Sequence, residues 1–471
     1  AQVAAMEMYE NTLSAQDPEN VEQVEITVAE SQTEQIANED AVEITFTAAG
    51  SVSGLAPYRD LAEAFTAENP DIIINVREPN YGAGMVDIST MANAADCFQW
   101  FPSVPSNLNE VVLNLDPLMD VDPTITAQDF FPYTLDMFRV QGQLVALPSS
   151  LRVPLIAYNK DLFDAAGVPY PQNGWTTDDF LETAVALTSG EGDNKQYGFA
   201  TQAWEFGEFS WFVDLLSGRH FDDSVDPPKL IINNPETVAA VRWFTNLTTE
   251  YEVKPTFVTD MNESSSSAYQ TRQEMLQNGR IAMWQHDIFN AGFGPSEPEL
   301  NLGYVTFPIP PDSTESAGYQ SSIGLFISAD TEFRQECWRW ITYLTTQHTV
   351  DEGLPAREAI ARSDGYAAQV GEELASAYLV SMDTATTAPD LSIYGDNEWQ
   401  GMATVWLLQS YTAIINDGVT VEEALDNGQN KIDSYYGCMV EQANFDDNQT
   451  RVDCLQEADD SLPSYYYNVS E

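Results

Sequence analysis

The chain has 471 residues, 43% of them hydrophobic, and its 74 Asp and Glu residues against 18 Lys and Arg residues give a formal net charge of −56. Such a charge repels phosphate backbones and disfavours an anionic membrane surface, so we expect no nucleic-acid partner. No run of apolar residues approaches the ~20 that a membrane helix needs. The first residues also lack the basic segment followed by an apolar segment that is typical of a signal peptide. We therefore expect a soluble protein from which any signal peptide has been removed. Self-repulsion on this scale indicates a salty, cation-rich or acidic setting, and an unadapted acidic exoprotein is the alternative.

Residues 1–41 contain acidic residues but no Lys or Arg, a composition typical of a solvated, largely disordered tether. Within this tether, residues 24–28 (VEITV) alternate like a strand and nearly repeat residues 42–46 (VEITF). A free alternating segment can add to a sheet edge of its own chain or of a neighbour. An edge strand, or self-association through this N-terminal segment, is therefore the alternative.

The folded part is predicted to begin at Val42 with an α/β pattern. Residues 42–48 alternate as in a strand, residues 58–67 have apolar side chains at helical spacing, and residues 72–76 form the next predicted strand. A strand, a helix and a strand of these lengths predict a βαβ unit and a parallel sheet.

The same alternation continues along the chain. Residues 144–148 and 155–158 have the pattern of strands. Helices are predicted from the cap at Thr176 to Leu187, from Pro235 onward, and from the capping box that begins at Thr420. Because roughly 400 folded residues exceed one ordinary domain, the α/β pattern predicts two lobes.

The cysteines predict a single disulfide outside the cytosol. Cys438 and Cys454 lie 16 positions apart in a segment with little core of its own, and a bond between them would contribute ~3 kcal/mol. Cys97 and Cys337 lie in apolar contexts and are each expected to be a buried small hydrophobic residue. No Cys-x-x-Cys or Cys/His cluster occurs, so we expect no zinc site. Four sequons allow surface glycosylation, at Asn246, Asn262, Asn448 and Asn468.

Several ordered motifs carry a resemblance to a known family. They are residues 147–168 (LPSSLRVPLIAYNKDLFDAAGV), 174–180 (GWTTDDF), 64–70 (AFTAENP), 279–284 (GRIAMW), 354–357 (LPAR) and 419–425 (VTVEEAL). Over about residues 42–433 the chain resembles extracellular solute-binding protein family 1, the sugar-binding substrate-binding proteins of ABC importers. It departs from the family in its acidic N-terminal segment, its cysteine-bearing C-terminal extension and its few Lys residues.

The resemblance implies two α/β lobes joined by a hinge, with a ligand cleft between them. It places the crossings between the lobes near residues 151–154, near residues 318–322 and after about residue 385. The implied organisation is residues 42–152 plus 320–385 for the first lobe, 153–319 plus 386–433 for the second, and 434–471 for an extension that holds the disulfide.

The function that the resemblance implies is capture of a sugar or oligosaccharide by hinge closure, for an ABC permease. It implies an extracytoplasmic location, periplasmic, secreted or anchored at the cell surface, with no cofactor, no metal and no catalysis. A surface-assembly protein of a filament or sheath, built on the same fold, is one alternative, and a glycan-active enzyme is another. No Gly-x-Ser-x-Gly, phosphate loop or dinucleotide fingerprint occurs, and 74 acidic residues make a catalytic carboxylate pair unrecognisable by eye.

A sugar site needs carboxylates and amides for the hydroxyl groups and flat aromatic rings for the C–H faces. Residues of these kinds near predicted strand ends or crossings are the candidates. For several the alternative is structural: Trp100 and Phe101 as core, Ser51 as a turn residue, and Arg152 in a hinge salt bridge rather than on an acidic sugar. The candidate ligand-binding residues are Ser51, Gln99, Trp100, Phe101, Arg152, Trp204, Glu208, Trp284, Asp287, Tyr319, Gln320 and Trp399.

Overall fold

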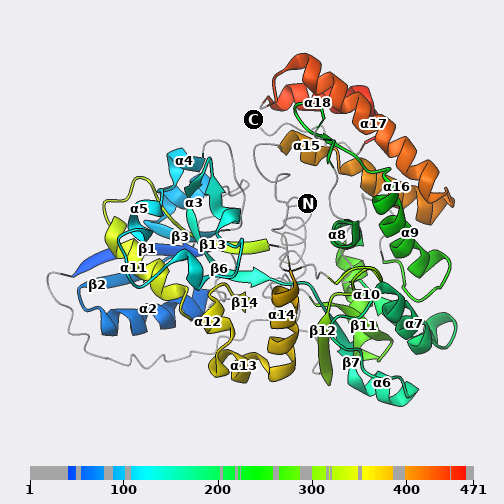
Figure 1. The fold of residues 1–471 in the computed structure, drawn as a ribbon, viewed down its shortest axis with the longest axis horizontal. Helices are drawn as coiled ribbons and strands as arrows, with labels where there is room; N and C mark the ends of the chain where they lie inside the picture. The colour runs from blue at the N-terminus through cyan, green and yellow to red at the C-terminus, as the bar shows by residue number, and fades with distance from the viewer. Residues whose placement is uncertain are drawn as a thin grey trace, which may run out of the picture.

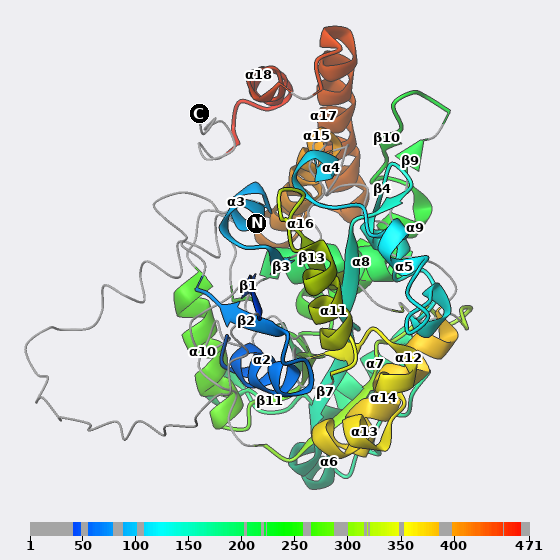
Figure 2. The same ribbon diagram turned by 90° about the vertical axis from the view of Figure 1, so that its left-hand side faces the viewer.

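The computed structural model describes residues 41–48, 55–78, 88–100, 108–201, 205–217, 221–222, 224–257, 265–286, 300–314, 318, 321–347, 353–385, 398–445 and 447–462. It shows two lobes, each with its own sheet, and Figure 2 views the molecule from the side of the first. The predicted tether at residues 1–40 and its strand-like repeat lie outside the described residues.

Lobe 1 is the part built on a six-stranded sheet, with the strands β1 (Val42–Ala48), β2 (Ile72–Val76), β3 (Cys97–Trp100), β6 (Ala146–Arg152), β13 (Ser321–Ile327) and β14 (Leu354–Pro355). Their order across the sheet is β14-β6-β13-β3-β1-β2. β1 is parallel to β2 and β3, and β13 lies antiparallel between β3 and β6. The helix α2 (Ala56–Glu68) connects β1 to β2, so the predicted βαβ unit is confirmed.

Lobe 2 is the part built on a four-stranded sheet, with the strands β7 (Leu155–Asn159), β8 (Tyr197–Ala200), β11 (Ile281–His286) and β12 (Leu302–Thr306). Their order is β12-β7-β11-β8, in which β7 is antiparallel to both of its neighbours and β11 is parallel to β8. Two short hairpins lie outside the main sheets, β4 (Arg139–Val140) with β5 (Gln143–Leu144) and β9 (Phe221–Asp222) with β10 (Lys229–Leu230).

Helices surround both sheets (Figure 1). With lobe 1 lie α2, α3 (Ile88–Ala94), α4 (Leu108–Val111), α5 (Asp116–Met119), α11 (Arg334–Leu344), α12 (Glu358–Ala361), α13 (Asp364–Val370) and α14 (Glu372–Thr384). With lobe 2 lie α6 (Lys160–Ala166), α7 (Thr177–Leu187), α8 (Glu205–Ser217), α9 (Pro235–Thr249), α10 (Ser265–Gln277), α15 (Glu398–Met402), α16 (Val405–Asp417), α17 (Val421–Gln442) and α18 (Asn448–Ala458).

The predicted helix starts are confirmed by their caps. The Thr176 hydroxyl accepts from the Asp179 N–H at 3.2 Å, and the Asp179 carboxylate accepts from the Thr176 N–H at 2.9 Å. Asn234 and Thr420 begin α9 and α17 in the same manner, each accepting from a backbone N–H three residues later. A side chain that binds an otherwise unpaired N–H of the first turn fixes where a helix begins.

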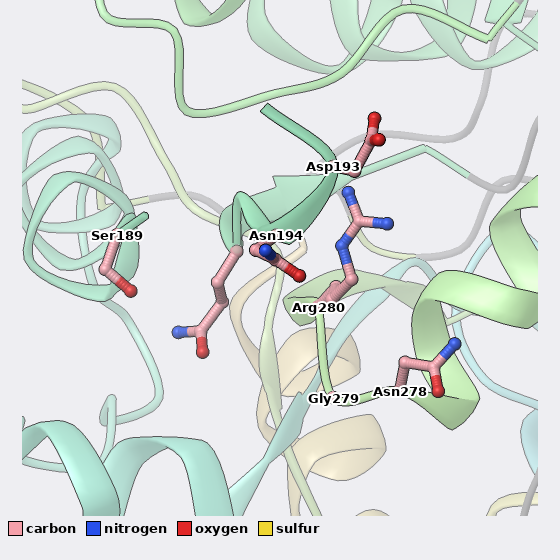
Figure 3. A pocket seen from close by; sticks show the side chains of 7 residues that line it. Ser189, Asp193, Asn194, Asn278, Gly279 and Arg280 are labelled. Atoms are coloured by element: carbon pink, nitrogen blue, oxygen red, sulfur yellow. The ribbon is translucent and has the colours of Figure 1, made fainter. Parts of the chain in front are cut away.

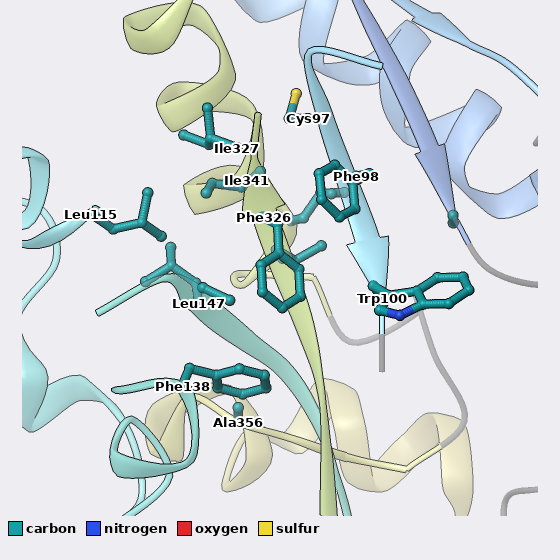
Figure 4. Packing of buried hydrophobic residues seen from close by; sticks show 14 of the residues in the cluster. Cys97, Phe98, Trp100, Leu115, Phe138, Leu147, Phe326, Ile327, Ile341 and Ala356 are labelled. Carbon is teal, nitrogen blue, oxygen red and sulfur yellow. The ribbon is translucent and has the colours of Figure 1, made fainter. Parts of the chain in front are cut away.

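Each lobe has its own hydrophobic core. In lobe 1, Phe98 stacks on Phe326 of the neighbouring strand with ring centroids 5.4 Å apart, and Phe138 meets Phe326 edge-on at 6.0 Å (Figure 4). In lobe 2, the ring of Phe212 packs against those of Phe244 and Phe307, with centroids 5.0 and 4.7 Å apart. Because the two cores consist mainly of different residues, each lobe can act as a stiff body.

The predicted disulfide between Cys438 and Cys454 is present, and it joins α17 to α18. The carboxylate of Asp459 then holds the end of α18 against α16 and α17, because it accepts from Trp406 Nε1 at 3.1 Å and from Lys431 Nζ at 2.7 Å. α17 is unbroken across residue 434, where the extension was predicted to begin, and Cys454 lies in the core of lobe 2.

The sequons differ in exposure. Asn448 is exposed as the first residue of α18, whereas Asn246 is half-buried in α9 and its amide donates to Glu250 at 2.7 Å. Asn262 and Asn468 lie outside the described residues. Among the described helices, none is long and apolar enough to cross a membrane.

Candidate functional site

The chain passes between the two lobes at three places, of which the structure describes the first in whole and the other two in part. β6 ends at Arg152 and leads through Val153 and Pro154 directly into β7. Beside this passage, β12 of lobe 2 ends at Thr306 and β13 of lobe 1 begins at Ser321. A later passage joins α14 to α15 through residues 385–397, most of which lie outside the described residues.

The direction of the strands places their carboxyl ends at this junction. In lobe 1, β3 runs in the same direction as β6, since both are antiparallel to β13, and so β1 and β3 point toward lobe 2. In lobe 2, His286 at the end of β11 pairs with Leu155 at the start of β7, so β11 and the parallel β8 point toward lobe 1. Open α/β sheets bind ligands at the carboxyl ends of their strands. The candidate site therefore lies between the lobes.

Three predicted site residues of lobe 1 are described, and all three are buried at this end of the sheet. The prediction placed Gln99 and Trp100 after the strand, but β3 continues through Trp100, and the two side chains are 4% and 7% exposed. Arg152 is the last residue of β6, opposite Ser321 in the ladder, and its guanidinium is also buried.

In lobe 2, Glu208 is buried in the first turn of α8. This amino end of α8 follows the carboxyl end of β8 in the chain. It lies near Tyr411, whose pKa its charge helps to raise.

Two predicted stacking residues lie in packed interiors instead. Trp284 is 1% exposed and packs with Ala157, Ala200 and Leu276 between the sheet and α10. Trp399 is 3% exposed, and its ring stacks on Phe445 with centroids 5.0 Å apart. Because these neighbours cover each indole almost completely, neither ring is accessible as a stacking face for a ligand.

The other candidates lie outside the described residues, where their placement stays a prediction. In the sequence they adjoin described residues at the junction, such as Ala48, Trp100, Thr201, His286 and Ser321. They are Ser51, Phe101, Trp204, Asp287, Tyr319 and Gln320.

A buried polar cluster beside the junction was not predicted. Glu205 begins α8, and its carboxylate is paired with the ammonium of Lys254, both side chains being fully buried. The same carboxylate accepts from the Tyr411 hydroxyl at 2.5 Å and from the Thr201 hydroxyl at 2.8 Å. The fully buried Arg272 donates to the carbonyl of Thr201 at 3.0 Å. We call these five residues the Glu205 cluster.

The Glu205 cluster fixes the two ends of a short segment at the junction. Thr201 directly follows β8, and Glu205 is the first residue of α8. The hydrogen bonds of the cluster hold both, and so they fix the residues on either side of 202–204. Burial, reinforced by the charge of Glu205, raises the pKa of Tyr411 well above its ordinary value, so this hydroxyl stays a neutral donor. No local pattern reveals Lys254 or Arg272 as members, because neither is close to Glu205 in the sequence.

A second polar group connects the lobes through α14, which stands between them in Figure 1. Ala377 and Tyr378 of α14 belong to the core of lobe 1. From the same helix, the carboxylate of Glu373 accepts from Tyr158 Oη at 2.9 Å and from Lys160 Nζ at 2.5 Å, both in lobe 2. His286 packs beside Tyr378 with ring centroids 6.4 Å apart, and burial lowers the pKa of this histidine to about 4, so it is neutral at pH 7.

We expect the Glu373→Gln variant to lose up to ~1 kcal/mol of stability at pH 7, a small loss because this carboxylate is 42% exposed. Burial by itself would raise the pKa of Glu373, but hydrogen bonds from Lys160 and Tyr158 outweigh it and lower the pKa. The contribution is therefore present above the unfolded pKa of about 4.3 and lost as the pH falls through the folded value.

Urea unfolding at a series of pH values between 7 and 3 measures this effect. The difference between the variant and the parent protein should shrink as the pH falls. Glu372→Gln, on the exposed neighbour, is the control and should change little at any pH. A difference for Glu373→Gln that is constant with pH would contradict the role of its charge.

Two surface pockets lie away from the junction. One, of about 470 Å³, has polar lining residues that include Ser189, Asn194, Asn278 and Arg280 (Figure 3). These residues precede β8 and β11, so the pocket is at the amino ends of both strands, opposite His286. The other, of about 250 Å³, lies in lobe 1 beside Asp96, at the amino end of β3. Neither pocket contains a predicted binding residue.

Comparisons with known proteins agree with this geometry. The family model described as bacterial extracellular solute-binding protein matches residues 48–348. A putative binding protein of Brucella abortus (strain 2308) is 21% identical over 408 residues, which cover 82% of this chain and 94% of that protein.

Two solved structures resemble the fold. The sugar-binding protein MalE from Xanthomonas citri superposes with a TM-score of 0.64 at 18% identity, covering 85% of this chain and all of that one. The ABC substrate-binding protein Lmo0181 from Listeria monocytogenes, solved in complex with cycloalternan, gives a TM-score of 0.62 at 21% identity, covering 84% of this chain and all of that one.

Proposed function

Because this chain belongs to the bacterial extracellular solute-binding proteins, we propose that it captures a sugar or oligosaccharide between its lobes and delivers it to an ABC importer. The observation that carries the proposal is the meeting of two sets of strand carboxyl ends at one junction, which the chain crosses directly from β6 to β7 through Val153 and Pro154. Two stiff bodies joined in this way can close around a ligand by a hinge motion. The MalE and Lmo0181 structures, one a sugar-binding protein and the other solved with a saccharide, support a sugar as the ligand.

The proposed site combines candidates from both sides of the junction. From lobe 1 we assign Ser51, Gln99, Trp100, Phe101 and Arg152, with Tyr319 and Gln320 before β13. From lobe 2 we assign Trp204, Glu208 and Asp287. These side chains supply aromatic faces and polar groups, as a sugar requires. Trp100 also belongs to the core of lobe 1, but it is assigned because it ends β3 at the junction. Trp284 and Trp399 are not assigned, because their indoles pack against α10 and Phe445.

The family is described as extracellular and solute-binding, which supports a location outside the cytoplasm and a role in binding. We propose a periplasmic or cell-surface position, with an ABC permease as the membrane partner and no catalysis by the chain itself. Glycosylation, at the exposed Asn448 first, and self-association through residues 1–40 stay predictions. The relatives described above are named for neither surface assembly nor glycan cleavage, so both alternatives have no support from them.

A panel of neutral mono- and oligosaccharides tests the function by thermal unfolding. A ligand present at 100 times its Kd should add ~2.7 kcal/mol to the free energy of unfolding and raise the Tm by a few degrees. Native mass spectrometry of the purified protein should detect the same compound bound. A panel without any shift, together with a ligand-free native mass, would overturn the proposal.

Matched variants locate the binding. Trp204→Ala should weaken sugar binding by 10-fold or more, about 1.4 kcal/mol, because the proposed site then loses an aromatic face. Tyr251→Ala removes an aromatic side chain that is 40% exposed on the surface of lobe 2, and it should leave binding unchanged. Equal effects of the two variants would place the ligand elsewhere.

A further inference from the structure

Cys97 and Cys337 lie against each other in the core of lobe 1. Cys97 begins β3, and Cys337 lies in the first turn of α11. Both side chains are 0% exposed, both are free thiols, and the Cys337 thiol is close enough to Cys97 to raise its pKa. The Sγ of Cys97 also donates to the carbonyl of Thr45 at 3.8 Å. Figure 4 shows Cys97 in the packed interior of lobe 1, together with Ile327 and with Ile341 of α11.

The surrounding contacts hold the two cysteines in this position. Asp96, directly before Cys97, accepts from the hydroxyl of Thr331 at 2.7 Å, and its carbonyl accepts from the Ser328 N–H at 2.9 Å. Both donors lie between β13 and α11. One turn after Cys337, Trp340 packs edge-on against Phe46, with ring centroids 5.6 Å apart, and Phe46 is the strand partner of Cys97. The sheet and α11 are therefore fastened together on both sides of the thiol pair.

We propose that Cys97 and Cys337 form a second disulfide in the mature protein. The chain has four cysteines, and the other two are already bonded to each other. Members of this family work outside the cytoplasm, where disulfides form and persist. The inference rests on that location and on the core of lobe 1, and it does not depend on the identity of the ligand.

The two thiols are oxidised by thiol–disulfide exchange with an external disulfide, such as that of an oxidoreductase or of oxidised glutathione. The thiolate of one cysteine attacks the external disulfide, which releases the first external thiol and leaves a mixed disulfide. The second cysteine then attacks the mixed disulfide at the protein sulfur and releases the second external thiol. Two protein thiols thus lose two electrons and two protons, and the external disulfide is reduced to two thiols.

The position of the pair also sets when the bond forms. Burial, together with the hydrogen bond to Cys337, raises the pKa of the Cys97 thiol well above its ordinary value. In the folded protein the Cys97 thiol therefore stays protonated, and both thiols are buried out of reach of an external disulfide. The bond forms before α11 packs onto the sheet. It then joins the two sequence segments of lobe 1, because β3 precedes the passage of the chain through lobe 2 and α11 follows it.

Counting free thiols tests the proposal. Protein secreted into an oxidising compartment is unfolded in guanidinium without reductant, alkylated with iodoacetamide, and analysed by intact mass and peptide mapping. We expect no alkylated cysteine and a cross-linked peptide pair that contains Cys97 and Cys337. Two alkylated cysteines at these positions, also after refolding from guanidinium with oxidised glutathione, would overturn the proposal.

Two variants sharpen the result. In the same assay, Cys97→Ser should leave one alkylated residue, Cys337. If Cys337 were alkylated to the same extent in this variant and in the parent protein, the pairing would be contradicted. The double variant Cys97→Ala/Cys337→Ala should have a Tm about 5–10 °C lower than the oxidised parent, because a long loop is no longer closed. If a variant fails to fold, the alkylation count on the unaltered chain decides. The sugar panel is independent of this outcome.

Discussion

We expect the Lys254→Met variant to lose about 3–5 kcal/mol in its free energy of unfolding, because it leaves Glu205 buried without its counter-charge. Both side chains of this ion pair are fully buried. The ammonium of Lys254 also donates to the Pro255 carbonyl at 3.2 Å and lies 5.2 Å from the ring centroid of Phe244. Removing one partner of a buried pair costs far more than the pair contributes, since the remaining charge cannot regain its hydration.

Urea denaturation at pH 7 measures this loss, and Lys195→Met is the matched control. Lys195 pairs with Glu252, whose side chain is 74% exposed, so that substitution should cost only ~0–1 kcal/mol. Adding Glu205→Gln to Lys254→Met should restore part of the stability, because the uncompensated charge is gone. A Lys254→Met loss no larger than that of the control would show that water reaches Glu205.

The consequence for function follows from the place of the Glu205 cluster. Since it holds the residues on either side of 202–204, the restored double variant should still bind ligand more weakly than the parent protein. The sugar panel, repeated on this variant, separates a loss of binding from a loss of stability.

We expect a comparable loss, about 3–5 kcal/mol, for Trp340→Ala in the core of lobe 1. This indole is 0% exposed and packs edge-on against Phe65 and Phe46, with ring centroids 5.3 and 5.6 Å away, and stacks on Tyr343 at 5.8 Å. Replacing it with Ala removes these contacts and leaves a cavity between α11 and the sheet.

Trp340→Phe is the control for size. It keeps an aromatic ring and removes an indole N–H that has no hydrogen-bond partner within the described part of the chain, so it should cost clearly less than the Ala variant. The same urea titrations measure both variants. Equal losses for Ala and Phe would mean that ring packing does not hold α11 on the sheet.

Much of the fold follows from short-range pattern. The unit of β1, α2 and β2 was predicted with nearly its observed bounds, because alternation and helical spacing are expressed within a few residues. The helix starts at Thr176, Pro235 and Thr420 were predicted for the same reason, since a cap or a proline at the first position acts within the first turn. The pairing of Cys438 with Cys454 needed only their closeness in the sequence.

The candidate site was less predictable. Trp284 lies near a strand end, as a stacking residue should, but its side chain packs under α10. Gln99 and Trp100 were placed after a strand that in fact includes them. A strand alternates between two faces, and where helices cover both faces the sequence pattern does not tell which side chains reach the ligand.

The amino-acid sequence by itself determined the α/β class, the two-lobed plan, the helix starts and the C-terminal disulfide, because each is encoded in composition or in contacts between near neighbours. Only the tertiary structure decided which way the strand ends point, that Lys254 and Tyr411 meet on Glu205, and that Cys97 lies against Cys337. These features join residues far apart in the chain, and their geometry exists only after the sheets and helices have packed.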